Sequence, residues 1–338
     1  MNYNRVGNSG LYVSELSLGA MIFGEESNRS TPEEDAVRMV HQFIGRGGTH
    51  IDTANTYANG RSEEILGRAL QGGKRERVTL ASKVRFGASP ESDSGAGLSR
   101  RVIMDQVERS LRRLQTSFID LYYMHGYDPH TPLEESLRAF DDLVRDGKVR
   151  YIGVSNFKAW QVMKSLGISD SHGWVRFIAG QYQYSLVMRD IEYEFSSLFR
   201  EEGVGMMAWG PLGGGFLSGK YRRGERPTIG RIATTDPVTE EAWDRRSTER
   251  NWRIIDAVGE VAEAHGATYP QIALAWLSRQ PTVSSVILGA RTMEQFEDNM
   301  GSIEIELTAE ELEKLNAAST LPEMYPYRMM QEYGMELT

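Results

Sequence analysis

The sequence predicts an α/β protein that closes into a (β/α)8 TIM barrel. Eight short apolar segments alternate with segments whose apolar residues recur at helical spacing, and such alternation favours parallel strands joined by helices. An open doubly wound sheet should show G-x-G-x-x-G after its first strand, but that strand ends here in Gly19-Ala20-Met21-Ile22. Polar and aromatic side chains also follow several strands directly, as expected at the C-terminal rim of a barrel.

The length and the composition fit one large domain. We expect a single domain over residues 1–338, with the barrel at about 15–318 and a C-terminal tail at 319–338. A chain of this length buries roughly three-quarters of its unfolded surface, so it needs no disulfide or metal to fold. It contains no cysteine, which excludes disulfides, thiol nucleophiles and cysteine-ligated zinc.

The charge and the N-terminus bear on partners and location. The formal net charge of −9 argues against nucleic acid or an anionic membrane as a partner. The first residues, MNYNRVGNSG, carry no apolar signal region, and no run approaches ~18 apolar residues. We therefore expect a cytoplasmic protein whose partner is a small molecule, and the sequence is compatible with a homo-oligomer without requiring one.

Turn, cap and periodicity signals place the elements of the first half. A small β-hairpin is expected at residues 3–14, turning at 7–10, and the first barrel strand follows at 16–19. Thr31 to Glu34 and Thr131 to Glu134 both read Thr-Pro-x-Glu, which is typical of a capping box with proline at the first helical position. We expect further strands at 49–53, 78–83 and 118–124, and helices after Thr31, near 62–70, over Ile103 to Leu114, and after Thr131.

The second half continues the alternation and adds a long loop and a tail. We expect strands at 150–154, 175–180, 203–208 and 283–288, and helices near 157–166, 192–202, 248–265 and 269–279. Thr292 to Gln295 is a further cap signal. The connection 211–247, after the seventh strand, is long for a barrel; it is a lid over a ligand or a disordered insertion, and Lys220 and Arg231 within it favour a lid. The Met- and Tyr-rich tail from Leu321 to Thr338 fits a cover over the substrate pocket or a contact with a partner chain.

Side chains suited to chemistry fall at or just past the ends of separate strands. They are Asp52, Lys83, His125, Asn156, Gln181, Trp209 and Arg291, and a turn after the second strand presents Tyr57. Because functional side chains gather where barrel strands end, we expect these residues to meet at one rim.

Four of these residues form a set suited to proton transfer. A free tyrosine has a pKa of ~10, and a cationic Lys83 beside Tyr57 would lower that pKa by roughly 1–3 units. Asp52 would keep Lys83 charged and aimed, and His125 can donate a hydrogen bond to a substrate carbonyl. A structural ion pair and a packed aromatic ring explain each residue singly, but their joint spacing over three consecutive strand ends favours a catalytic site.

The same residues carry a resemblance to the aldo-keto reductases, from about residue 3 to 316. The motifs are Asp52 to Tyr57 (Asp-Thr-Ala-x-x-Tyr), Lys83, Leu121 to His125, Gly153 to Phe157, Gln181-x-x-Tyr184 and Ile287 to Arg291. The segment Trp209-Gly210-Pro211-Leu212 is similar to the Trp-Ser-Pro-Leu of the subgroup resembling potassium-channel β subunits, with Gly210 removing one hydroxyl contact. The resemblance implies an (α/β)8 barrel and NADP(H)-linked carbonyl reduction.

The resemblance also implies a role for each site residue. Tyr57 would be the general acid, tuned by Lys83 and Asp52, and His125 would orient the substrate. Ser155, Asn156 and Gln181 would hold the nicotinamide carboxamide, and Trp209 would stack on the ring. The pyrophosphate would lie along Leu212 to Gly215 with Lys220 in reach. The expected cofactor-binding set is Gly19, Met21, Asp52, Ser155, Asn156, Gln181, Trp209, Gly210, Pro211, Leu212, Gly214, Lys220, Arg231, Gly289, Arg291, Gln295, Asp298 and Asn299.

Two further expectations concern cofactor choice and substrate contacts. Arg291 beside the helix start at Thr292 makes an anion site for an adenosine 2′-phosphate, which favours NADP(H) over NAD(H); a surface arginine is the alternative. Gln295 and Asn299 would face the adenine from that helix. The residues expected to line the substrate pocket are Phe23, Tyr57, Arg85, Phe86, His125 and Tyr127.

The leading hypothesis is a reversible NADPH-dependent reductase of aldehydes or ketones. The main alternative is a regulatory subunit that binds NADPH with slow or no turnover, and a third is an aldolase-like barrel with Lys83 as a Schiff-base lysine. Gly214 to Lys220 narrowly misses a P-loop, because Tyr221 stands where Ser or Thr is needed. No metal is expected, because His125 to His130 is interrupted by Pro129 and has no fourth ligand nearby.

Overall fold

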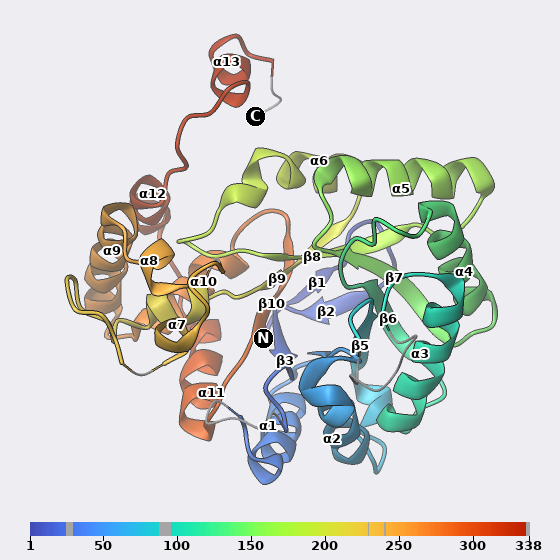
Figure 1. Ribbon diagram of the computed structural model, residues 1–338. Coiled ribbons are helices and arrows are strands. Elements are labelled where there is room, and N and C mark those ends of the chain that lie inside the picture. The colour runs from blue at the N-terminus through green and yellow to red at the C-terminus, as the bar shows by residue number, and fades with distance from the viewer. Residues whose placement is uncertain (25–29, 88–95, 229, 240, 336–338) are drawn as a thin grey trace.

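The computed structural model describes residues 1–24, 30–87, 96–228, 230–239 and 241–335. Eight parallel strands form a closed barrel in which each strand pairs with the next and the last pairs with the first (Figure 1). The strands in barrel order are β3 (Leu16–Gly19), β4 (His50–Asp52), β5 (Thr79–Val84), β6 (Ile119–Met124), β7 (Val149–Ser155), β8 (Phe177–Gln183), β9 (Gly205–Trp209) and β10 (Val283–Leu288). The predicted (β/α)8 barrel is confirmed.

Helices surround the barrel (Figure 1). They are α1 (Glu33–Gly45), α2 (Arg61–Ala69), α3 (Arg100–Leu114), α4 (Leu133–Arg145), α5 (Ala159–His172), α6 (Phe195–Glu202), α9 (Glu249–His265), α10 (Tyr269–Ser278), α11 (Met293–Met300) and α12 (Ala309–Ala318). In α4 the buried residues Leu133, Leu137 and Phe140 follow helical spacing. Phe140 stacks on Tyr122 of β6, with ring centroids 5.4 Å apart. This packing fixes the outer face of the strand against its helix.

The opposite face of each strand fills the barrel interior, because side chains alternate along a strand. In β6, Tyr122 packs outward with the helices, whereas Tyr123 lies in the interior cluster. The predicted N-terminal hairpin, β1 (Tyr3–Arg5) and β2 (Tyr12–Ser14), contributes Val6 and Val13 to that interior cluster. Gly7 has a φ of +54°, and a Cβ there would lie 2.1 Å from the Gly203 carbonyl oxygen. The hairpin therefore packs against the residues that precede β9 at the N-terminal end of the barrel.

Two of the predicted capping boxes are wrong. The N-caps of α1 and α4 are Pro32 and Pro132, and neither helix start has a side-chain cap hydrogen bond. The hydroxyl of Thr31 instead donates to the Ala290 carbonyl, and the hydroxyl of Thr131 donates to Asp128. A carbonyl far away in the chain takes the Thr31 hydroxyl, whereas a side chain three residues earlier takes the Thr131 hydroxyl. The Thr292 cap of α11 is confirmed, because its hydroxyl accepts from the Gln295 backbone N–H.

The long connection 211–247 packs onto the barrel through short helices. It contains the 3-10 helix η4 (Gly213–Ser218) and the α-helical turns α7 (Arg231–Thr234) and α8 (Trp243–Arg246). Phe216, Tyr221 and Trp243 form an aromatic cluster with Trp252 of α9, with ring centroids 5.0–6.5 Å apart. Burial of large rings is strongly favourable, so this cluster anchors the described part of the loop to the outer helices.

The C-terminal tail projects from the barrel and ends in α13 (Tyr327–Glu332) (Figure 1). Tyr327 contacts the ring of Tyr193 at a centroid distance of 4.9 Å, and its hydroxyl donates to Glu194. No tail residue up to 335 lines the pocket at the C-terminal rim, so this part of the tail does not cover it. Among the described residues, no helix combines the length and apolar character that crossing a membrane requires.

Candidate active site

Lys83 stands at the centre of a hydrogen-bonded group at the C-terminal rim. Its Nζ lies 2.5 Å from Asp52 Oδ1, 2.8 Å from the Thr53 carbonyl oxygen and 3.2 Å from the Tyr57 hydroxyl. An ammonium has three N–H donors and no acceptor, so all three are used. The Tyr57 oxygen therefore accepts from Lys83, and its own proton is left to donate elsewhere.

Strand register brings these residues together from separate parts of the chain. Asp52 ends β4 and Lys83 lies near the end of β5, and both side chains are buried. The β4–β5 pairing places Asp52 beside Ala81. The second carboxylate oxygen of Asp52 accepts from Gln181 Nε2 of β8 at 2.8 Å. Asp52 therefore links two strands across the rim, and its position is set by the barrel rather than by a loop.

A tight turn carries Tyr57 from β4 back toward Lys83. Tyr57 begins the 3-10 helix η1 (Tyr57–Gly60), in which Ala58 and Asn59 have φ values of 47° and 53°. The left-handed region is costly for residues other than glycine, so surrounding contacts must hold the turn. Thr56 donates to the Gly87 carbonyl, and Asn55 donates to Phe86 and to Gln106. Residues beyond β5 thus fix the orientation of Tyr57.

His125 follows β6 and lies against Tyr57. Its backbone N–H donates to the Val84 carbonyl, and its ring meets Tyr57 and Phe86 edge-on at centroid distances of 5.7 and 5.0 Å. Burial, with the charge of Lys83, lowers the pKa of His125 to about 2. The imidazole is therefore neutral. Its Nδ1 is buried and has no hydrogen-bond partner among the described residues.

The pKa values of Lys83 and Tyr57 depend on two opposing effects, which are burial and the interaction with nearby charged groups. Burial alone would lower the pKa of Lys83, but the Asp52 carboxylate and Tyr57 outweigh it, and the net pKa is raised. Burial raises the pKa of Tyr57, and this exceeds the opposing effect of Lys83. The expectation that Lys83 brings the Tyr57 pKa below its ordinary value is therefore wrong, because desolvating a phenolate costs more than one nearby ammonium returns. Tyr57 stays protonated and Lys83 stays charged.

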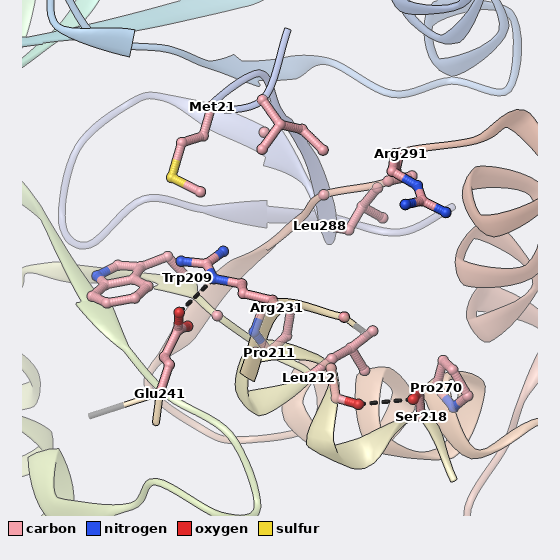
Figure 2. Close-up of a pocket in the computed structure, with 18 of the residues that line it drawn as sticks. Met21, Trp209, Pro211, Leu212, Ser218, Arg231, Glu241, Pro270, Leu288 and Arg291 are labelled. Carbon is pink, nitrogen blue, oxygen red and sulfur yellow. Dashed lines mark hydrogen bonds and ion pairs between the residues drawn. The ribbon is translucent and has the colours of Figure 1, made fainter. Parts of the chain in front are cut away.

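These groups open onto a cavity of about 1100 Å³. Single-ligand pockets commonly measure roughly 300–1,000 Å³, so this cavity has room for a dinucleotide and a small substrate. Asp52, Tyr57 and His125 line it, and Lys83 lies beneath them. Figure 2 shows Trp209 at one side of the pocket and Arg291 at the opposite side. Asp52, Tyr57, Lys83 and His125 are called the tetrad below. The pocket thus extends from the tetrad toward the N-terminus of α11.

An amide-rich surface lies beside the tetrad. The Ser155 hydroxyl donates to the Gln181 carbonyl, and Asn156 Nδ2 donates to Ser155 and to the His125 carbonyl oxygen. Asn156 has a φ of 56°, a conformation that asparagine tolerates better than most residues. Trp209, at the end of β9, is half-buried and faces the same pocket. A flat ring next to oriented amide and hydroxyl groups suits a planar heterocycle that bears a carboxamide.

The backbone leaves space along the middle of the pocket. Gly214 and Gly215 line it and have φ values of 70° and 89°, which a side chain would strain. Apart from its two chain neighbours, no described residue has an atom within 4 Å of where a Cβ on Gly289 would sit, and Gly289 lines the pocket. Close approach of backbone to ligand is therefore possible along both segments, as a diphosphate requires.

The far side of the pocket is basic. Partial burial, with the charge of Arg291, lowers the pKa of Lys220. The Arg291 backbone N–H donates to Gln295, and Asn299 donates to the Gly289 carbonyl oxygen. Asp298 also lines the pocket, and its carboxylate accepts from the Thr268 hydroxyl. Two cations near the N-terminus of α11 suit a phosphate, so the residues present fit a nicotinamide dinucleotide.

The residues expected to bind the cofactor all line one cavity, whereas only some of the residues expected to bind the substrate do so. Every residue of the expected cofactor set lines the cavity. Of the residues expected to line the substrate pocket, Tyr57 and His125 line the cavity. Phe23 does not line it, because its side chain is fully buried in the core and its backbone pairs with Thr31. Phe86 is exposed beside His125, and the Arg85 guanidinium lies 5.0 Å from the Phe86 ring centroid. Tyr127 packs edge-on against Phe157 and does not line the cavity.

Other pocket residues were not identified from the sequence. They are Ile22, Ser218, Tyr221, Arg222, Glu225, Arg226, Pro227, Thr228, Gly230, Glu241, Pro270, Leu274, Ile287, Leu288 and Ala290. Many of them belong to the 211–247 connection, whose length and charges were the available signal. Glu241 is the least expected of them, because no sequence motif predicts an acidic side chain at this place in a basic pocket. Among the described residues, no group of three or more His, Cys, Asp or Glu is arranged to hold a metal.

Comparison with known proteins agrees with this geometry. The profile of the Aldo/keto reductase family matches residues 15–320. One similar protein is "Uncharacterized oxidoreductase YrpG" of Bacillus subtilis (strain 168), 37% identical over 94% of this chain and 95% of that protein. Another is "Probable voltage-gated potassium channel subunit beta" of Arabidopsis thaliana, 33% identical over 90% of this chain and 92% of that protein. A third is "Versiconal hemiacetal acetate reductase" of Aspergillus parasiticus, 32% identical over 93% and 96% respectively.

These matches confirm the resemblance read from the motifs, including its leaning toward the channel-β subgroup. The chain therefore belongs to the aldo/keto reductase family, a family of oxidoreductases that act on small molecules and generally use NAD(P)H.

Proposed function

We propose that this protein is an NADPH-dependent reductase of aldehydes or ketones, reversible to alcohol oxidation, with Tyr57 as general acid. The observation that carries the proposal is the use of all three Lys83 donors, one of them on the Tyr57 oxygen. The Tyr57 proton is thereby available to a ligand in the pocket. NADPH, when bound, supplies the hydride.

The chain's own residues supply and control the proton. Tyr57 donates its hydroxyl proton to the carbonyl oxygen, and the Lys83 ammonium stabilises the phenolate that is left. Asp52 keeps Lys83 charged and immobile through the 2.5 Å contact. The neutral His125, with its proton on Nε2, donates to the same carbonyl oxygen and fixes its direction. Phe86, which lies against His125, and Arg85 beside it remain proposed contacts for a part of the substrate outside the cavity, since neither lines it; Tyr127 packs against Phe157 instead.

The choice of NADPH over NADH rests on Lys220 and Arg291. Both line the pocket near the N-terminus of α11, and Arg291 contributes to lowering the Lys220 pKa, so their charges lie close together. A 2′-phosphate placed there would relieve the repulsion between the two cations. NADH carries a hydroxyl at that position and would leave the repulsion in place.

The Lys83 environment disfavours an aldolase role. A Schiff-base lysine must reach the neutral amine and attack a carbonyl. Here the net pKa of Lys83 is raised, although burial opposes this, and all three donors are engaged. Borohydride should therefore trap no substrate on Lys83.

The second candidate function is cofactor binding with slow or no turnover in a regulatory subunit. It is favoured by the relatives that are named as probable potassium channel β subunits, at 33% identity for the Arabidopsis protein. Tight NADPH binding without consumption on any carbonyl would support this role and contradict the reductase.

The test is an NADPH fluorescence titration followed by a carbonyl and alcohol panel. We expect the Tyr57→Phe variant to keep its NADPH affinity within a few-fold and to lose reduction, because the proton donor is gone while the pocket shape is retained. Retained turnover in this variant would refute the general-acid assignment.

A further inference from the structure

Glu241 is a buried acid inside the basic pocket. Its side chain lines the cavity, and the residue is only 8% exposed. One carboxylate oxygen, Oε2, lies 2.5 Å from Nε of Arg231. The other, Oε1, is buried and accepts no hydrogen bond from the described residues. A buried carboxylate is costly unless it is paired, so this placement calls for an explanation.

The pair joins separate parts of the 211–247 connection. Arg231 begins α7, and Glu241 lies ten residues later in the chain. A Cβ on Gly214 would lie 3.4 Å from the Glu241 Cβ, so Glu241 also packs beside the glycines of η4. Glu241 thus holds Arg231 next to the segment proposed for the diphosphate.

The contact atom decides how Arg231 is presented. A guanidinium is planar and carries its five N–H donors in a fixed fork. Because Nε contacts Glu241, the guanidinium edge that carries Nε is turned to that carboxylate, and the edge formed by the two terminal nitrogens is turned to another side. In the view of Figure 2 the Arg231–Glu241 pair is drawn on the same side of the pocket as Trp209 and Met21. The Arg231 charge also lies near enough to Tyr57 to oppose the effect of burial on its pKa. The guanidinium therefore sits close to the catalytic end of the cavity.

We propose that Glu241 is a positioning residue that anchors Arg231 through Nε and presents its terminal nitrogens to the diphosphate of bound NADPH. This inference rests on the proposed function. An unanchored arginine loses side-chain entropy when it is ordered. A guanidinium that is ordered before the ligand arrives avoids that loss. Glu241 also balances the charge of Arg231 before the phosphates bind.

A double-mutant cycle tests whether Glu241 acts through Arg231. The variants are Glu241→Ala, Arg231→Met, the double substitution and the conservative Glu241→Gln, each titrated with NADPH by fluorescence and followed by stopped-flow dissociation. We expect Glu241→Ala to raise the NADPH Kd about tenfold and Arg231→Met to raise it at least as much. The double variant should match Arg231→Met alone, because the anchor has nothing left to hold. Glu241→Gln should fall between wild type and Glu241→Ala, since it keeps an acceptor but not the charge.

The matched control is Asp236→Asn, which removes the charge of an exposed carboxylate of the same connection that does not line the pocket, and which keeps an oxygen to accept from the Val238 backbone N–H. It should leave the NADPH Kd within about twofold, because an exposed charge is screened. Additive losses in the cycle, or an unchanged or tighter Kd in Glu241→Ala, would overturn the inference while leaving the reductase intact. So would an unchanged Kd accompanied by a raised KM for substrate, which would assign Arg231 to the substrate. Failure of the wild type to bind NADPH would instead contradict the proposed function, and with it the ligand that the inference requires.

Discussion

Replacing Lys83 by methionine separates catalysis from cofactor binding. The Lys83 side chain is fully buried, and its Nζ lies 3.2 Å from the Tyr57 oxygen. A hydrogen bond to a charged group contributes about 1.5–3 kcal/mol. If that contribution is realised when the phenolate forms, each ~1.36 kcal/mol is a tenfold loss of rate. We therefore expect kcat for carbonyl reduction to fall roughly 10- to 150-fold. Because Lys83 lies beneath the pocket wall, the NADPH Kd should change only a few-fold.

The same substitution leaves the buried Asp52 carboxylate without its cation. A second substitution at Asp52 therefore serves as the control for the loss of stability. Breaking a buried ion pair by removing one partner costs about 3–5 kcal/mol of stability. Asp52 would keep Gln181 Nε2 as a neutral donor. The double variant Lys83→Met with Asp52→Asn removes the stranded charge, so it should recover part of the stability but none of the rate. The assay is kcat at saturating NADPH, the NADPH Kd by fluorescence, and urea unfolding on all three proteins. A Lys83→Met enzyme within threefold of the wild-type kcat would refute the role of Lys83 in stabilising the phenolate.

Three other perturbations test the pocket, the barrel core and the substrate side. Arg291→Ala should weaken NADPH about tenfold and NADH by less than twofold in matched titrations, and equal losses would contradict a 2′-phosphate site. Burial lowers the pKa of His50 from 6.5 to about 4. The unfolded chain therefore binds a proton that the folded protein refuses, and about 3 kcal/mol of stability should be lost as pH falls from 6.5 to 4. Urea unfolding at several pH values should show that loss flattened in His50→Gln. Phe23→Ala should cost about 3–5 kcal/mol in stability with little change in KM, whereas Phe86→Ala should raise KM with little change in stability. The reverse pattern would mean that the two rings had been assigned to the wrong places.

The fold was predictable because each element carries its own local pattern. Helix α4 shows its buried face in the spacing of Leu133, Leu137 and Phe140, and a neighbouring strand does not alter that spacing. Caps were less predictable, because a hydroxyl can be claimed from far away. Thr31 gives its hydroxyl to Ala290, which is 259 residues distant in the chain. A local rule cannot detect such a competitor.

The residues of the candidate site also differ in how well local sequence patterns predict their positions. Residues at strand ends, such as Asp52 and Gln181, have positions set by parallel register, so their meeting at one rim follows from the fold class. Residues in loops have no such constraint. Phe23 and Phe86 both follow strands, yet one is fully buried and the other is exposed. Glu241 was missed because its contact with Arg231 depends on how the 211–247 connection folds.

The ionisation of Tyr57 shows why a list of partners does not determine a pKa. From the sequence, a neighbouring lysine predicts a more acidic phenol, and that effect is present. The structure adds the loss of water around the phenol, and Asp52 partly cancels the charge of Lys83 as Tyr57 experiences it; together these exceed the effect of the ammonium. The balance has a chemical consequence for a reductase. A phenol that keeps its proton at neutral pH is ready to donate it, and the Lys83 ammonium becomes most valuable only as the phenolate forms. In the proposed mechanism the tetrad would therefore hold the proton in the resting state and stabilise the charge that appears when the proton leaves.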